Sequence, residues 1–478
     1  MQIVNTEEWT SKIKEVIDYI NEIKKITKER GLKYYINTFG CQLNENDSEK
    51  IAGMLSAAGI TKTDKEADAD IIIFNTCCVR ENAEDRLYGK LGEVKKYKED
   101  KGTIICVGGC MMQQEHVSEK IRRSYPYVDV VFGIHTLDNF AKDLYLAVEE
   151  KRKIEDIIDV DGEVFEGIPT KRDDNIKASV LIMNGCNNFC TYCIVPYVRG
   201  RERSRRPEDI IDEVKALAKA GYKEITLLGQ NVNSYMVAEN RKGMKITNTN
   251  IHSFAELLAE LDKIEGIERI RFTSPHPKDF TDDVIDVIAN SNHICKLIHM
   301  PLQAGSSNVL KKMNRNYTKE EYLKLVDIIR SKIPNATFTT DIIVGFPGET
   351  EEDFEDTLDV VSKVRYEQIY MFIYSRRVGT VADTMENQIP EDVKHKRFDR
   401  LKKLTEEIIS EDGNKYIGTI QKVLVEGVSK NNDDVLTGRT DSYKVVNFKG
   451  DKSLIGRMVD VKIDENHVWY LSGICDNI

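Results

Sequence analysis

The sequence contains no apolar run that approaches the length needed to cross a lipid bilayer. Its first residues, MQIVNTEEWTSKIKEV, are polar and mixed in charge, so they lack the apolar core of a secretory signal. These two absences predict a cytoplasmic protein without a membrane partner. The sequence also lacks internal repeats and low-complexity tracts, so its 478 residues are expected to form two or three ordinary domains.

An excess of positive charge is also missing, because the formal net charge is −11. Binding to nucleic-acid phosphates is usually driven by Lys and Arg, so the balance argues against a general coat for nucleic acid. A local basic surface remains possible at residues 199–206, RGRERSRR, which hold five Arg against one Glu. Any nucleic-acid partner would therefore be bound by a local face of the protein and not by its overall charge.

Cysteine, in contrast, is plentiful. In a chain without an export signal, structural disulfides are not expected, and metal ligation or redox chemistry is favoured. The ten cysteines lie at positions 41, 77, 78, 106, 110, 186, 190, 193, 295 and 475.

The first part of the chain predicts a helical extension followed by an α/β domain. Residues 1–30 carry apolar positions at helical spacing, and residues 31–149 alternate short apolar runs with helical stretches. This alternation is typical of a parallel sheet with crossover helices, an N-terminal α/β sandwich. The charged residues 150–175 are expected to be a linker.

The second part predicts a larger α/β domain and a small β domain. Residues 176–410 contain six strand–helix units, the number for a partial barrel and not for a closed eight-fold one. The strands are expected at 179–183, 224–228, 269–273, 296–300, 337–344 and 368–374. In residues 411–478 the strand–helix alternation gives way to five short β-rich runs separated by Gly and Asp turns. This pattern predicts a small antiparallel β-barrel.

Three cysteines form one compact motif. Cys186, Cys190 and Cys193 have C-x3-C-x2-C spacing just after the first strand of the central domain. Three thiolates on one loop can bind three irons of a 4Fe-4S cube and leave the fourth iron open to a small molecule. A structural zinc site would need a fourth ligand nearby, and this loop has no further Cys or His close in sequence.

A second set of cysteines is dispersed in sequence. Cys41, Cys77 and Cys110 each follow a predicted strand of the N-terminal sheet, so all three are expected at its carboxyl edge, where α/β sheets build ligand sites. They make a second three-thiolate cluster site, with ordinary buried cysteines as the alternative. The remaining cysteines are interpreted as packing residues: Cys78, Cys106, Cys295 and Cys475.

The triplet after the first strand of a six-unit barrel resembles the radical S-adenosylmethionine (SAM) superfamily. In that superfamily the open iron binds the amino and carboxylate groups of SAM, and one electron cleaves SAM to a 5′-deoxyadenosyl radical. The aromatic Tyr192 before the last cysteine fits the same pattern. The resemblance implies SAM contacts from residues of LLGQNV and DIIVGFPGE, namely Gly229, Gln230, Asn231, Gly345, Gly348 and Glu349.

Nearly the whole chain resembles the methylthiotransferases of the MiaB type. The motifs NTFGCQLNENDSE, FNTCCVRENAEDR and VGGCMMQQ are similar to the three cysteine motifs of that family's N-terminal domain, and the C-terminal barrel resembles a TRAM RNA-binding domain. The family has members that act on N6-isopentenyladenosine or threonylcarbamoyl-adenosine at tRNA position 37, and others that act on an aspartate of a ribosomal protein. LGQNVNSY and SPHPKDF favour the first.

The resemblance implies a division of work between two 4Fe-4S clusters. The cluster on Cys186, Cys190 and Cys193 cleaves SAM, and the resulting radical activates carbon 2 of the adenine, whose C–H bond acid–base catalysis cannot break. The cluster on Cys41, Cys77 and Cys110 presents sulfur, which a second SAM methylates. The implied partners are the tRNA anticodon stem-loop and a low-potential electron donor such as flavodoxin or ferredoxin.

Several charged groups leave alternatives open. The arginines at 199, 201, 203, 205 and 206 could bind phosphate or the SAM carboxylate, or they could form a solvated run paired with Glu202, Glu208 and Asp209. Lys311, Lys312 and Arg315 are expected on an exposed helix face, and His276 and His299 are expected to be structural. One rival function is an RNA-binding protein with one structural cluster, and the second cysteine set argues against it. Another is a glycyl-radical activase, which would have a single SAM cluster, or ferredoxin-like extra cysteines, and no TRAM-like barrel.

Overall fold

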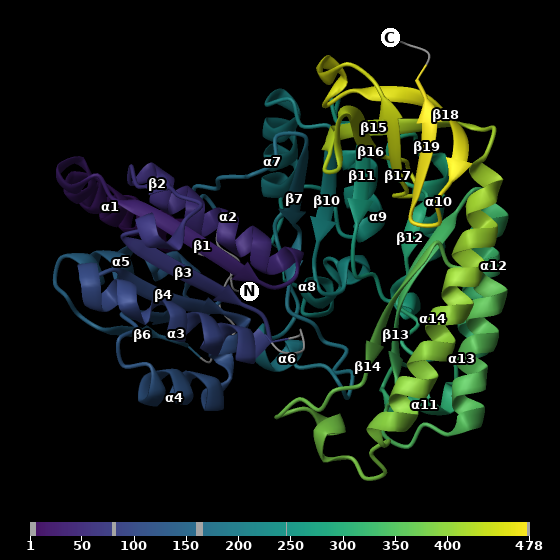
Figure 1. The fold of residues 1–478 in the computed structure, drawn as a ribbon, viewed down its shortest axis with the longest axis horizontal. Coiled ribbons are helices and arrows are strands. Elements are labelled where there is room, and N and C mark those ends of the chain that lie inside the picture. Colours follow the sequence, from purple (N-terminus) through teal and green to yellow (C-terminus); the bar gives the residue numbers. More distant parts are fainter. Residues whose placement is uncertain (1–5, 79–82, 159–165, 245, 476–478) are drawn as a thin grey trace.

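Residues 6–78, 83–158, 166–244 and 246–475 are described by a computed structural model, and three bodies follow one another along the chain (Figure 1). The predicted segments that include residues 1–5, 79–82, 159–165 and 476–478 lie in part outside the described residues. Within these ranges, no helix has the length and apolar character that a membrane span requires. Charged residues are spread along the whole sequence and interrupt its apolar stretches.

The N-terminal body is a six-stranded, fully parallel sheet in the order β2-β1-β3-β4-β5-β6. Its strands are β1 (Lys33–Phe39), β2 (Thr61–Lys62), β3 (Ile71–Thr76), β4 (Ile104–Gly109), β5 (Val130–Phe132) and β6 (Ile154–Asp156). Every residue of β3 is buried, as expected for a central strand covered on both faces. The α/β sandwich predicted from the alternating pattern is confirmed.

Helices cover both faces of this sheet. One core joins α1 (Thr6–Arg30), α2 (Gln42–Ala57) and α5 (Phe140–Val148), and another core joins α3 (Ala83–Lys101) and α4 (Glu115–Ser124) on the opposite face. The N-terminal extension is thus a packed layer, held through Val16, Ile20 and Ile23. Residues 150–175 were expected to be a linker, but Ile154–Asp156 within them form the strand β6 at the edge of the sheet. The strand was not predicted because two of its three residues are charged.

The central body is the predicted partial barrel, made of two parallel three-stranded sheets. The first has the order β11-β10-β7, with β7 (Lys177–Leu181), β10 (Glu224–Leu228) and β11 (Arg269–Phe272). The second has the order β12-β13-β14, with β12 (Leu297–His299), β13 (Thr337–Val344) and β14 (Gln368–Ile373). An isolated parallel bridge between Ile270 and Ile294 links the two sheets.

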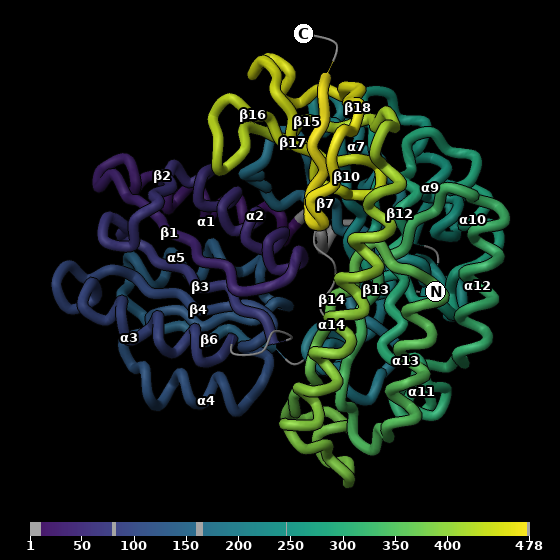
Figure 2. The backbone as a smooth tube through the Cα atoms, turned by 45° about the vertical axis from the view of Figure 1, so that its right-hand side comes forward, coloured from purple at the N-terminus to yellow at the C-terminus, as the bar shows by residue number. Residues whose placement is uncertain are grey.

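Helices form the outer layer of this partial barrel (Figures 1 and 2). They are α7 (Pro207–Lys219), α9 (Phe254–Leu261), α10 (Asp282–Asn290), α11 (Ser307–Lys312), α12 (Lys319–Lys332), α13 (Glu351–Val364) and α14 (Glu391–Gly413). Two short helices lie in loops: α6 (Val195–Val198) follows β8 (Met183–Asn184), and α8 (Val237–Arg241) follows β10. Strand β8 pairs with β9 (Arg203–Ser204). Because these helices cover the outer face of the strands, functional side chains can lie only on the inner face of the barrel or in the loops.

The C-terminal body is a closed five-stranded barrel in the order β15-β16-β17-β19-β18. Its strands are β15 (Ile420–Ser429), β16 (Asn432–Arg439), β17 (Val445–Lys449), β18 (Met458–Asn466) and β19 (Tyr470–Ile474). Four pairings are antiparallel, but β17 and β19 pair in parallel, so the fully antiparallel barrel expected from the sequence needs this correction. Closure removes the free strand edges of so small a sheet.

Buried arginines fasten this barrel to the central body. Arg269 donates to the carbonyl oxygens of Arg439 (2.7 Å) and Lys422 (2.8 Å). Arg271 donates to those of Asp441 (2.8 Å) and Thr440 (2.9 Å). Removing the barrel would leave two buried guanidinium groups without these partners, so the two bodies are expected to fold as one unit.

Candidate active site

The three dispersed cysteines lie at one edge of the N-terminal sheet. Cys41 follows β1, Cys77 follows β3 and Cys110 follows β4, and these strands are direct neighbours in the order β1-β3-β4. Because the strands are parallel, their carboxyl ends meet at the same edge. The structure therefore brings together residues that are up to 69 positions apart in sequence.

An amide network holds the loops that carry these thiols. The Asn44 amide donates to Asn75 Oδ1 (3.2 Å) and to the Thr76 carbonyl oxygen (3.1 Å), and Asn75 donates back to the Asn44 carbonyl oxygen (2.8 Å). Cys41 Sγ lies 3.5 Å from Asn44 Oδ1. Gly109, with φ of 101°, stands just before Cys110, and a Cβ there would lie 2.4 Å from Asn75 Oδ1. The network explains why the cysteine motifs contain Asn and Gly.

The thiols of this edge contact one another in pairs. A hydrogen bond with the Cys77 thiol lowers the pKa of Cys41 to about 6 against the opposing effect of burial, and Arg199 acts in the same direction. The pKa of Cys110 is also lowered, first by its hydrogen bond with Cys78 and then by Arg199. Cys78, expected from the sequence to be a packing residue, is buried in a cluster with Cys110 and also hydrogen-bonds the Cys110 thiol.

The compact cysteine triplet lies on the loop that follows β8. The backbone N–H of Cys186 donates to the Gly200 carbonyl oxygen (3.1 Å), and that of Cys193 donates to the Cys190 carbonyl oxygen (2.9 Å). Gly185 has φ of 78°, and a Cβ there would lie 2.0 Å from the Arg201 carbonyl oxygen, so only glycine fits before Cys186. Burial raises the pKa of Cys186 to about 11 and that of Cys193 to about 12.

Arg315 is a functional candidate that sequence reasoning misplaced. It was expected on an exposed helix face, but it follows the end of α11 and is only 5% exposed. Its Nη1 lies 3.4 Å from Cys190 Sγ, while Nε donates to the Tyr317 hydroxyl (3.1 Å) and Nη2 donates to the Pro301 carbonyl oxygen (3.0 Å). A positive group thus sits against the triplet. Lys312 is only partly exposed, and its Nζ donates to the Gly348 carbonyl oxygen (3.0 Å).

Arg199 connects the two cysteine sites. It follows α6, six residues beyond Cys193, and is 3% exposed. Its Nε donates to Cys110 Sγ (3.0 Å), Nη2 donates to Asp47 Oδ2 (2.8 Å) and Nη1 donates to Asn184 Oδ1 (3.3 Å). One guanidinium from the triplet loop therefore reaches both a predicted cluster thiol and a carboxylate of the N-terminal body.

The other arginines of the run divide between the two alternatives. Arg205 is buried against Glu166 and Glu213 and is structural, whereas Arg206 forms the expected ion pair with Asp209 near the surface. The Arg201 guanidinium lies 4.3 Å from the centroid of the Phe189 ring.

Glu202 and Glu208 were expected as ion-pair partners of this run. Glu202 accepts hydrogen bonds from Asn187, and Glu208 accepts one from Thr247. Arg203 donates to the Arg199 carbonyl oxygen (3.0 Å). The run is thus neither a uniform phosphate-binding face nor a uniform solvated one.

Buried polar atoms without protein partners gather at the ends of β10 and β11. Both amide atoms of Gln230, Oδ1 of Asn231 and Nε2 of His276 have no hydrogen-bond partner among the described residues. Asn231 Nδ2 donates to Asp279 Oδ2 (2.9 Å), and the His276 ring contacts Tyr317, which in turn bonds Arg315. Buried polar atoms are normally satisfied, so these atoms point to a ligand close to the triplet.

The remaining predicted SAM contacts have protein partners. Gly229 ends the turn after β10, and a Cβ there would lie 2.6 Å from Met183 Cγ. The Glu349 carboxylate accepts from the backbone N–H of Gly345 (2.8 Å) and from Arg397 (2.8 Å), and burial raises its pKa to about 7. Tyr192 is half-buried against the central core. Their contact with SAM stays a prediction, as does that of Gly348.

The donor sets fit iron–sulfur cubes better than single ions. No three Cys, His, Asp or Glu side chains in the described part of the chain surround a common metal position. In a cube each thiolate binds a different iron, so the three sulfur atoms need not converge on one point. Two sets of three thiols, each beside a buried cation, therefore suit two 4Fe-4S cubes with one open iron each.

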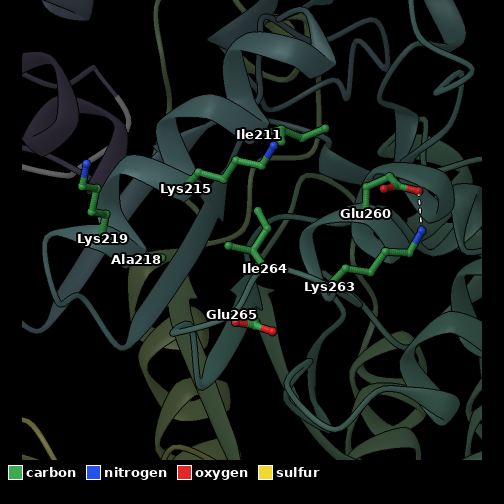
Figure 3. Close-up of a pocket in the computed structure, with 8 residues that line it drawn as sticks. All are labelled: Ile211, Lys215, Ala218, Lys219, Glu260, Lys263, Ile264 and Glu265. Carbon is green, nitrogen blue, oxygen red and sulfur yellow. Dashed lines mark hydrogen bonds and ion pairs between the residues drawn. The ribbon is translucent and has the colours of Figure 1, made fainter.

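The other hollows and cysteines lie apart from these sites. A depression between α7 and α9 is lined by residues of the helical layer, among them Lys215, Lys219 and the ion pair of Glu260 with Lys263 (Figure 3). Cys106, Cys295 and Cys475 are buried, which agrees with the packing role predicted for them. His299 bonds Thr339 and contacts Tyr370.

Three family descriptions match consecutive parts of the chain. "Uncharacterized protein family UPF0004" matches residues 33–133, "Radical SAM superfamily" matches 180–361 and "TRAM domain" matches 414–475. Among solved structures, the radical SAM methyltransferase TsrM from Kitasatospora setae aligns with a TM-score of 0.52 at 15% identity, covering 82% of this chain and 78% of its own. At that identity the likeness shows the fold alone.

Curated relatives match over almost the full length. A protein of Acetivibrio thermocellus is 52% identical over 462 residues, which cover 95% of this chain and 94% of the relative. One of Clostridium tetani is 52% identical and covers 95% and 98%. Both carry the name tRNA-2-methylthio-N6-dimethylallyladenosine synthase. With two cysteine sites on a radical SAM fold, this chain belongs to that family of tRNA methylthiotransferases.

Proposed function

We propose that this tRNA methylthiotransferase acts on N6-dimethylallyladenosine at position 37 of the anticodon stem-loop and that its cysteine sets divide the work. Cys186, Cys190 and Cys193 hold the 4Fe-4S cluster that binds SAM. Cys41, Cys77 and Cys110 hold the second 4Fe-4S cluster, from which sulfur is delivered. The observation that carries this assignment is Arg199, whose guanidinium follows the first set in sequence and bonds a thiol of the second.

The chemistry requires a cofactor because carbon 2 of the adenine has neither an acidic proton nor a leaving group. SAM, held beside the cluster of Cys186, Cys190 and Cys193, would supply on one-electron reduction a radical able to remove that hydrogen. The protein's own task is to place the base between the two sites and to keep water out. Arg199 and Asp47 hold the two bodies together at this place, with the Nη2 to Oδ2 distance at 2.8 Å.

The unpartnered polar atoms supply the binding groups for SAM. Gln230 offers a donor and an acceptor, Asn231 offers an acceptor and His276 offers Nε2. Burial, Arg315 and Lys278 all lower the pKa of His276, so its ring is neutral at physiological pH. Because Nδ1 accepts from the backbone N–H of Lys278 (3.2 Å), the ring proton lies on Nε2, which can donate one hydrogen bond. Mixed donors and acceptors suit the amino and carboxylate groups and the ribose hydroxyls of SAM. The unpartnered atoms therefore support the predicted SAM contacts of Gln230 and Asn231. They also add His276, which was predicted to be structural, as a further candidate contact.

The remaining parts of the proposal concern partners and domain limits. The electron donor is a low-potential protein such as flavodoxin or ferredoxin, and the cytoplasm, where tRNA is processed, is the place of action. Residues 31–149 with β6 form the second-cluster domain, residues 176–410 the SAM domain and residues 411–478 the RNA-binding domain. The exposed indole of Trp469 on the C-terminal barrel offers a stacking surface for RNA.

The decisive experiment analyses tRNA from cells that lack this protein. We expect the 2-methylthio derivative to be missing from digested tRNA and N6-dimethylallyladenosine to accumulate, as measured by mass spectrometry. Re-expression of the wild-type chain restores the product, and re-expression of the Cys110→Ala variant does not. Loss of the methylthio form of threonylcarbamoyl-adenosine, or of a modified ribosomal aspartate, would instead assign the protein to a sibling activity.

A further inference from the structure

On the inner face of the β12-β13-β14 sheet, β14 carries two aromatic side chains that the described protein leaves about half exposed. Along each strand alternate residues point to opposite faces. Ile298, Ile342 and Ile369 are buried in the core under the outer helices. The opposite face of the same strands therefore presents the residues between them, and on β14 these are Tyr370, 42% exposed, and Phe372, 51% exposed.

An acidic group lies on the same inner face. Asp341 of β13 is the direct register partner of Tyr370 on β14. His299 of β12 contacts both, since its Nε2 lies 3.6 Å from Asp341 Oδ2 and its ring centroid lies 5.9 Å from that of Tyr370. Its Nδ1 lies 3.0 Å from Thr339 Oγ1. These contacts place one carboxylate beside the exposed ring of Tyr370.

This face runs from the C-terminal barrel to the second cysteine site. At the start of β14, Glu367 pairs with Lys444 of the barrel (3.1 Å). Beyond its end, the Arg377 guanidinium donates to the carbonyl oxygen of Cys78 (3.0 Å), next to Cys110. Figures 1 and 2 both show β14 on the side of the central body that faces the N-terminal body. A base extruded from tRNA onto this face would therefore lie on the side of the second cysteine site.

We propose that Tyr370 and Phe372 receive the dimethylallyl group of the substrate adenine and that Asp341 excludes acidic substituents at the same nitrogen. The inference rests on the proposed function and adds the residues that set its specificity. The five-carbon dimethylallyl group is apolar and gains by covering exposed aromatic surface. Threonylcarbamoyl ends in a carboxylate, which would be desolvated beside the carboxylate of Asp341.

The first test measures binding of short anticodon stem-loop RNAs by fluorescence anisotropy, using the iron-loaded protein. Wild type is expected to bind the RNA with dimethylallyl-adenine more tightly than the same RNA with plain adenine. Phe372→Ala should weaken binding of the dimethylallyl RNA by about tenfold and leave the plain RNA unchanged. Ile17→Ala, an equally exposed apolar residue on α1, serves as the control and should change neither.

The second test measures specificity in product formation. Asp341→Asn should raise the share of threonylcarbamoyl tRNA that is methylthiolated when both tRNAs compete, while SAM cleavage stays at the wild-type rate. If Phe372→Ala and Asp341→Asn keep the wild-type preference, the aromatic site is refuted and the proposed function stands. If wild type itself forms no methylthio product from dimethylallyl tRNA, the proposed function fails.

Discussion

The two cysteine sites are built in opposite ways. Cys186, Cys190 and Cys193 share one loop, whose turn is held by Gly185 and by the backbone bond from Cys186 to Gly200. The other set comes from three separate loops, aligned only because β1, β3 and β4 are neighbours in a parallel sheet. The first site is a local structure, and the second is a product of the fold.

Their electrostatic surroundings differ as well. Burial raises the pKa of Cys186 to about 11, whereas thiol contacts and Arg199 bring that of Cys41 to about 6. Arg199 bonds directly to Cys110 Sγ at 3.0 Å, while Arg315 lies 3.4 Å from Cys190 Sγ. The thiols of the sheet-edge site are therefore perturbed first by one another and then by an arginine of the central body, so this site also depends on how the two bodies are joined.

The largest expected effect comes from removing the local site. Changing Cys186, Cys190 and Cys193 together to Ala should lower the iron content from about eight to about four per chain and abolish SAM cleavage. Iron analysis and deoxyadenosine release measure both. Cys295→Ala, a buried cysteine outside both sites, should leave iron and cleavage at wild-type values. A wild-type iron content of about four would contradict the two-cluster arrangement.

Removal of the sheet-edge site should separate the two activities. The triple Ala variant of Cys41, Cys77 and Cys110 should also keep about four irons, yet it should still cleave SAM while forming no methylthio product. The reason is that the loop of Cys186, Cys190 and Cys193 is held by its own backbone hydrogen bonds and does not need these thiols. Cys106→Ala on β4 is the matched control. Continued methylthio transfer by the triple variant would show that these three cysteines only pack.

Arg199→Met should weaken the junction between the two sites. It leaves the carboxylate of Asp47 without its buried partner, which should cost about 3 kcal/mol of unfolding free energy in denaturant titrations. Loss of a cationic hydrogen bond to Cys110 should also lower the reduction potential of the sheet-edge cluster, measured by spectroscopic titration in the variant without Cys186, Cys190 and Cys193.

Two matched variants interpret this result. Arg206→Met removes an ion pair near the surface and should cost no more than about 1 kcal/mol. Arg199→Lys keeps the charge and should restore part of the potential but not the full stability, because lysine lacks the planar fork that reaches three acceptors. An unchanged potential in Arg199→Met would limit this residue to a structural role.

The smallest effect is expected from Cys78→Ser. Cys78 touches Cys110, but the cube needs only three thiolates, so the variant should keep about eight irons and should form product at nearly the wild-type rate. Iron analysis beside a product assay measures this. A fall to half the iron would make Cys78, and not one of the other three, a ligand of the sheet-edge cluster.

Periodicity predicted most of the strands, and the exceptions have physical causes. The strand β3 begins with a continuous apolar run and β13 ends with one, and both strands were predicted within two residues of their limits. Strand β6 was missed because its residues Ile154–Asp156 are mostly charged and it forms only by adding to an existing edge. The parallel pairing of β17 with β19 depends on barrel closure, which strand patterns do not encode.

The candidate site shows the same division. The spacing of Cys186, Cys190 and Cys193 was enough to predict a cluster loop, since the ligands are neighbours in sequence. Arg315 was misplaced because the residues around it resemble a basic helix end, and only the packing of Tyr317 and Pro301 turns it toward Cys190.

The sequence by itself determined the three bodies, the compact cysteine loop and the family resemblance, because each depends on order and spacing along the chain. Only the tertiary structure decided that Cys78 touches Cys110, that Arg199 after the triplet bonds Cys110 and that Tyr370 lies beside Asp341. These contacts join residues far apart in the chain, and their formation depends on strand order and on the packing of one body against another. Sequence patterns over a few neighbouring residues do not predict contacts between residues that are far apart in the chain.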